Sequence, residues 1–146
     1  MGELTRIQLS EIAQVWREIA RTLAVWQATH WSMLNTVQHF DLNAYQNSLL
    51  TRAQDIDERS YLLLSEPANS TFSTTLRLLE RASEILRDTT NSFAALNIGA
   101  LAVALAAGIA RNNTRTIQLA LSELRELVEG DVPVEQINAG GFTPLL

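Results

Sequence analysis

The stretch NSFAALNIGALAVALAAGIARNNTR, which runs from Asn91 to Arg115, decides the fold. Between Phe93 and Ala110 the only strongly polar side chain is Asn97. A helix that is apolar on every side is buried either in lipid or in the middle of a protein core. The segment is therefore either a membrane-spanning helix or the central helix of a bundle.

Three features of this segment fit a membrane span. Its length of about 18 residues reaches the lower limit for crossing the hydrocarbon layer. Arg111 and Arg115 flank one end, as a positive-inside anchor would. Ala100, Ala104 and Gly108 stand four residues apart, and such a row of small residues lets two helix backbones approach closely.

The composition of the segment favours a core helix instead. Alanine, a mild hydrophobe, dominates, and no Trp or Tyr lies near either end to form an interfacial belt. A single span in mid-chain would also place the two halves of the protein on opposite sides of a membrane. We therefore expect a helix that is buried in the core of a soluble, oligomeric protein, and we keep a bilayer span over 93–110 as the alternative.

N-terminal to this segment, apolar side chains recur in steps that alternate three and four, a coiled-coil-like seam. Thr5 and Gln8 have the spacing of a capping box that would start the helix. The pattern predicts one helix of about 35 residues, roughly 50 Å long. Such a helix implies a rod-shaped bundle or pairing with a second chain. The members of the seam are Leu9, Ile12, Trp16, Ile19, Leu23, Trp26, His30, Met33, Val37 and Phe40.

The rest of the chain predicts three more helices around the apolar one. A second helix is expected over 44–64, capped by Asp41 or Asn43, and a third over 72–87. A last helix follows the apolar segment and ends at Gly130, at the usual place of a C′ glycine. We predict an all-α, elongated bundle of four to five helices in a single domain, 1–130.

Residues 131–146 are expected to form an extended C-terminal tail with an apolar end. Phe142, Leu145 and Leu146 could dock on a neighbouring subunit, or the segment could be a frayed terminus.

Composition excludes several classes of function. There is no cysteine, which rules out disulfides, thiolate metal sites and a catalytic Cys. The net charge of -5 makes nucleic acid an unlikely partner. The N-terminus lacks the pattern of a signal peptide, which favours a cytoplasmic location while membrane association through 93–110 stays open. The Glu-x-x-His spacing of di-iron bundles and the common nucleotide and hydrolase motifs are absent.

His30 is the residue that interrupts the apolar seam. It could bind a haem or a metal in a bundle core, or act as a pH switch. The plainer interpretation is a polar seam residue that sets register or oligomeric state. His39 lies off the seam and is expected to be solvated. We predict no cofactor and no metal, with His30 as the weak candidate.

Two stretches resemble parts of signalling receptors. The stretch ALAVALAAGIARNNTRTIQLALSELRELVEGDVPVE, 100–135, resembles the junction where a receptor's membrane helix enters a HAMP linker. The stretch DIDERSYLLLSEP, 55–67, is similar to the central turn of CHASE-type four-helix sensor domains. The resemblance implies a membrane-anchored signalling module. The chain departs from it, because no first membrane helix is visible and about 25 residues separate the turn from the apolar helix.

The sequence as a whole favours a non-enzymatic, self-associating protein with a structural or protein–protein interaction role, which could be a subunit of a larger assembly. Its partners would be copies of itself or other helical proteins. The alternatives are a membrane-anchored sensory module and a cofactor or metal binder that uses His30. The predicted contact residues are Trp16, Trp26, His30, Trp31, Ala100, Ala104, Gly108, Phe142, Leu145 and Leu146.

Overall fold

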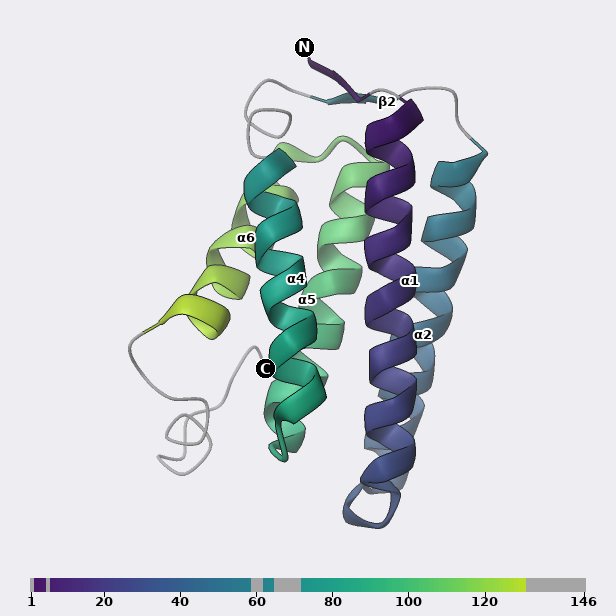
Figure 1. Cartoon of the computed structure of the whole chain (residues 1–146), viewed down its shortest axis with the longest axis vertical. Helices are drawn as coiled ribbons and strands as arrows, with labels where there is room; N and C mark the ends of the chain where they lie inside the picture. Colours follow the sequence, from purple (N-terminus) through teal and green to yellow (C-terminus); the bar gives the residue numbers. More distant parts are fainter. Residues whose placement is uncertain (1, 5, 59–61, 65–71, 131–146) are drawn as a thin grey trace.

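The computed structural model describes residues 2–4, 6–58, 62–64 and 72–130. The expected tail with Phe142, Leu145 and Leu146, and Thr5 of the expected capping box, lie outside the described residues. Within them the protein is an all-α bundle of helices that run alternately up and down its long axis (Figure 1), as the periodicity predicted. The helices are α1 (Arg6–Thr29), the short 3₁₀ helix η1 (Trp31–Met33), α2 (Thr36–Asp57), α4 (Phe72–Asp88), α5 (Ser92–Ala110) and α6 (Thr114–Glu129).

The single long helix expected from Leu9 to Phe40 is wrong, because the chain turns between α1 and α2. Asn35 caps α2 through a capping box with Gln38: the Asn35 side chain accepts from the Gln38 backbone N–H at 2.8 Å, and the Gln38 side chain accepts from the Asn35 N–H at 2.9 Å. These two bonds satisfy backbone donors that a continuous helix would have used. α1 and α2 therefore form an antiparallel hairpin (Figure 1).

The turn divides the predicted seam into a buried part and an exposed part. The six members on α1, from Leu9 to Trp26, are each no more than 3% exposed. Met33, which lies in the turn, is 51% exposed, and Val37 and Phe40, which follow the turn, are 67% and 73% exposed. The same three-and-four spacing therefore lines the core on α1 and faces outward on α2.

α5 contacts α1, α2, α4 and α6. Asn91 starts it, because its side chain accepts from the backbone N–H groups of Phe93 and Ala94. Within the described residues α5 alone is long and apolar enough to cross a membrane, with a mean hydropathy of 2.1, and 56% of that window is buried in the bundle. The surrounding helices therefore cover just over half of this apolar surface, and the rest of it is partly exposed.

α5 ends in a Schellman motif that was not anticipated. Asn112 takes the left-handed conformation with φ of 53°, the Asn112 N–H donates to the Ile109 carbonyl, and the Asn113 N–H donates to the Gly108 carbonyl at 2.9 Å. The side chain of Asn113 then caps α6. At the end of α6, Gly130 has φ of -68°, so it is not the left-handed C′ glycine that was predicted.

Glycines let α5 approach two neighbouring helices closely. A Cβ at Gly99 would lie 2.6 Å from the ring of Tyr45 on α2, and a Cβ at Gly108 would lie 3.0 Å from Ile117 on α6. Ala100 and Ala104 of the predicted small-residue row are half-buried. The closest approach to α2 is therefore made at Gly99, one residue away from that row.

Two short strands close one end of the molecule. β1 (Gly2–Leu4) pairs antiparallel with β2 (Leu62–Leu64), with Glu3 opposite Leu63. Strands of three residues are too short to show the alternation by which strands are predicted from sequence.

Candidate functional site

The outer face of α2 is the candidate functional site, because it carries no charge. The nine exposed residues of this helix are all uncharged, whereas six of the seven exposed residues of α4 are charged. The solvent face of a surface helix is normally rich in charged residues. The exposed residues of α2 are Thr36, Val37, Phe40, Asn43, Ala44, Asn47, Leu50, Thr51 and Gln54.

Six of these residues continue the three-and-four spacing of the sequence seam. We call them the outer seam: Val37, Phe40, Ala44, Asn47, Thr51 and Gln54. This spacing places all six on one stripe of the helix, as the a and d positions of a coiled coil. The stripe is apolar from Val37 to Ala44 and polar from Asn47 to Gln54. The inner face of α2 is made by Leu42, Leu49, Ala53 and Ile56, which pack in the core.

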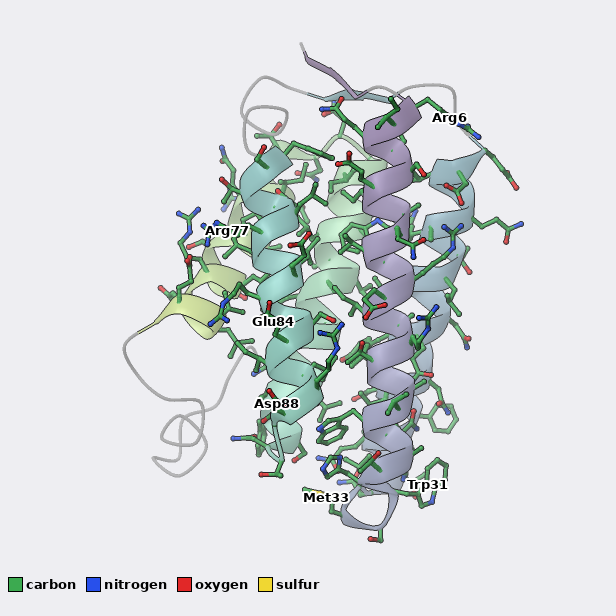
Figure 2. The ribbon with its side chains drawn as sticks, in the orientation of Figure 1. Arg6, Trp31, Met33, Arg77, Glu84 and Asp88 are labelled. Carbon is green, nitrogen blue, oxygen red and sulfur yellow. The ribbon has the colours of Figure 1, made fainter. Side chains whose placement is uncertain are left out.

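A groove of about 550 Å³ runs beside the outer seam. It is open to solvent, and Trp31 is one of the residues that line it. Figure 2 shows Trp31 at the end of the α1–α2 hairpin. Trp31 is 59% exposed, so it presents an aromatic surface to any molecule in the groove. The lining residues, Trp31, Thr36, His39, Phe40, Asn43, Ala44 and Asn47, include no acidic or arginine side chain.

A polar network under the groove holds His39 in place. Its Nε2 lies 3.1 Å from the Trp31 carbonyl, which can only accept, so Nε2 donates. In the neutral ring Nδ1 then accepts from the amide of Gln27 at 2.9 Å, and the Gln27 carbonyl accepts from Gln46 at 2.6 Å. The rings of Trp31 and His39 lie 3.9 Å apart. His39 is therefore half-buried and bonded through both ring nitrogens, so it is less solvated than expected.

His30 makes two contacts with Trp26 of α1. Its Nδ1 donates to the Trp26 carbonyl at 2.9 Å, and its ring stacks on the indole of Trp26 at 4.4 Å. The indole N–H of Trp26 in turn donates to the Thr89 carbonyl at 2.8 Å, which ties the end of α1 to the α4–α5 turn. Among the described residues no group of three or more His, Asp or Glu side chains could hold a metal ion.

Of the three tryptophans predicted as contact residues, only Trp31 lies on the surface. Trp16 and Trp26 are 0% and 3% exposed and pack in the core. The buried Nε1 of Trp16 has no hydrogen-bond partner within the described part of the chain. Trp31 can therefore face a partner, whereas Trp16 and Trp26 can do so only if the bundle opens.

A second groove, of about 220 Å³, lies between α1 and α4. Two of its carboxylates are engaged with arginine, because Arg87 donates to Glu18 at 2.5 Å and Arg81 donates to Glu84 at 3.0 Å. Its buried Ser83 hydroxyl lies 3.5 Å from that of Thr22. No histidine of the described residues lines this groove beside either hydroxyl.

Sequence reasoning found only part of this site. Trp31 was predicted as a contact residue, and Val37 and Phe40 as members of the seam, but the predicted seam stopped at Phe40 because the residues that continue it are mostly polar. The three-and-four spacing continues past Phe40 through Asn47 and Gln54, and this continuation was a readable signal. Gln27 and Gln46 carried no signal, because only the folded hairpin brings them to His39.

The chain shows no significant match to any family model, curated protein or solved structure.

Proposed function

We propose that this chain is a non-enzymatic, self-associating helical-bundle protein with a structural or protein–protein interaction role. The observation that supports the proposal is the uncharged outer face of α2, where Phe40 and Val37 are 73% and 67% exposed. Exposing large apolar side chains side by side forgoes the free energy that their burial would release. Contiguous patches of this kind mark interaction surfaces on proteins.

The distribution of charge supports association between copies. The chain carries a net charge of -5, so two copies repel each other at long range. A face without carboxylates or arginines is where two such molecules can meet without burying unpaired charges. The exposed charges of α4, by contrast, would lose hydration on contact.

The test is the molar mass of the full chain, measured by light scattering on a sizing column without detergent. We expect a discrete oligomer whose mass rises with protein concentration. Phe40→Glu should shift the equilibrium toward monomer, because it places a charge in the contact. Leu119→Glu is the matched control, since Leu119 is 55% exposed on α6, away from α2, and its substitution should leave the mass unchanged. A monomer at every concentration would refute the proposal.

The second candidate is a membrane-anchored sensory module, and the hydropathy of α5 favours it. In that state α5 would have to exchange its contacts with α1, α2, α4 and α6 for lipid. Recovery of the chain only from the membrane fraction, and as a uniform species only after detergent is added, would support this candidate and exclude the first.

A further inference from the structure

We propose that the outer seam of α2 pairs in parallel with the outer seam of a second copy, across a two-fold axis that runs along the two helices. The inference rests on the proposed self-association and adds to it the surface, the orientation and the register. The partner that binds the outer seam is a second copy of this chain. Three observations support this choice: the charge of the seam, the order of residues along it and the shape of the groove.

Charge is the first argument for a second copy. In a two-fold dimer every charged residue near the axis would face its own like-charged copy. The outer seam itself has no such residue, and α2 is uncharged from Leu42 to Thr51; the charged residues that flank this stretch, Asp41, Arg52 and Asp55, are half-buried and lie off the seam. A strongly basic or acidic partner would gain no ion pair here. The seam is therefore complementary to itself and to no charged surface.

The order of residues along the seam selects the parallel orientation. In parallel pairing each residue meets its own copy, so Val37, Phe40 and Ala44 form apolar layers. Asn47 then meets Asn47 of the second copy, and an amide can donate to and accept from another amide. Antiparallel pairing over the full seam would instead set Val37 against Gln54, which would leave an amide without a partner.

The groove beside the seam provides a hole for a side chain of the second copy. Phe40, Asn43, Ala44 and Asn47, which all line it, stand at i, i+3, i+4 and i+7. Four residues at this spacing form the hole that receives one knob in a coiled coil. In the parallel register this knob is Ala44 of the second copy, whose small side chain lets the two backbones approach closely.

The available area predicts a weak dimer. Trp31, Val37, Phe40 and Leu50 together expose on the order of 500 Å² of apolar surface, if aromatic side chains carry roughly 150–250 Å² each. A standard interface buries about 800 Å² on each partner. Flanking Asn and Thr side chains would supply the difference. We expect dissociation in the micromolar range, so assembly depends on concentration.

Disulfide trapping in the full chain tests the register, because the chain contains no cysteine. Ala44→Cys and Thr51→Cys are prepared as separate single variants, with Leu119→Cys on α6 as the control. A disulfide needs Cα atoms about 4.4–6.8 Å apart. In the parallel register both seam variants should oxidise mainly to covalent dimer, and the control should not exceed the background. Phe40→Glu should weaken dimerisation at least tenfold.

The outcomes separate this inference from the proposed function. In an antiparallel pair centred on Ala44, the two copies of Thr51 would lie about 20 Å apart along the axis, since each is seven residues from the centre at 1.5 Å per residue. An oligomer in which Thr51→Cys fails to cross-link would therefore overturn the parallel register and leave self-association standing. A monomeric chain would overturn both.

Discussion

Replacement of Gly99 by alanine tests the close packing of α5 against α2, which sets how α2 presents its outer face. The new Cβ would lie 2.6 Å from Cδ2 of the Tyr45 ring and 3.3 Å from its Cγ. These atoms belong to the inner part of the ring, so the ring cannot avoid the methyl group by moving its tip alone. The new Cβ would also lie 3.4 Å from Cδ1 of Leu23, which is an ordinary van der Waals contact.

Two opposing terms set the magnitude. Overpacking a core by one methyl group costs about 1–3 kcal/mol. Alanine in a helix interior gains about 1 kcal/mol over glycine. Gly99→Ala should therefore lower the free energy of unfolding by about 1 kcal/mol, which corresponds to a fall in Tm of about 4 °C for a domain of this size. When Tyr45→Ala removes the ring, only the helix term is left, and the same substitution should stabilise by about 1 kcal/mol.

The measurement is urea unfolding followed by far-ultraviolet circular dichroism for the wild type, both single variants and the double variant. Equal m-values across the set would show that the comparison is valid. The expected result is a change of sign between the two backgrounds. The reasoning fails if Gly99→Ala destabilises both backgrounds equally, or if it stabilises the wild type.

Three further substitutions test other parts of the structure. Gln27→Leu should lower the free energy of unfolding by about 1–3 kcal/mol, since it leaves His39 and Gln46 without a buried partner; a neutral result in urea unfolding would show that the network contributes nothing. Burial, and then the charge of Asp41, raise the pKa of Tyr45 above 10.0, so its contribution to stability is complete below pH 10 and is lost as pH rises further. Because the chain has no lysine, Tyr45→Phe should flatten this alkaline decline measurably; an unchanged slope would contradict the prediction. Asn91→Ala should lower the free energy of unfolding by about 1 kcal/mol, because it removes the cap of α5. The control, Asn97→Ala in the middle of the helix, should not lower it. Equal losses of stability for the two variants in thermal unfolding would argue against the cap.

The sequence predicted the elements whose ends are marked by local chemistry. α4 and α5 begin and end within about one residue of the predicted bounds, because Asn91 caps one helix and polar residues separate the others. The break after Ala110 was also expected. In each case the signal lies within a few residues of the helix end, where backbone N–H and C=O groups lack partners inside the helix and are capped by side chains.

The start of α2 was mispredicted because two structures satisfy the same spacing. Apolar residues in steps of three and four through Phe40 fit a continuous helix as well as they fit a hairpin. The capping box of Asn35 and Gln38 was present in the sequence, but it competes with an uninterrupted pattern. Which face of α2 is buried depends on Leu42, Leu49 and Ile56 meeting α1 and α5, and this is settled only by tertiary packing.

The candidate site was only partly predictable. Val37, Phe40 and Trp31 could be recognised as members of the seam or its neighbours, but their exposure follows from the turn at 30–35. The absence of charge on α2 is visible in the sequence, yet it becomes meaningful only when the exposed residues are known. The bonds among Gln27, His39 and Gln46 join two helices and have no local signal.

The place of α5 in the order of the helices also has a consequence for biosynthesis. A chain grows from its N-terminus at about 5–20 residues per second, so the roughly 90 residues before α5 take several seconds to appear. Helices and short helical hairpins form in microseconds to milliseconds. α1, α2 and α4, which all contact α5, are therefore available before it leaves the ribosome. The order of the elements along the chain limits the time for which the most apolar segment is exposed to water or to a membrane.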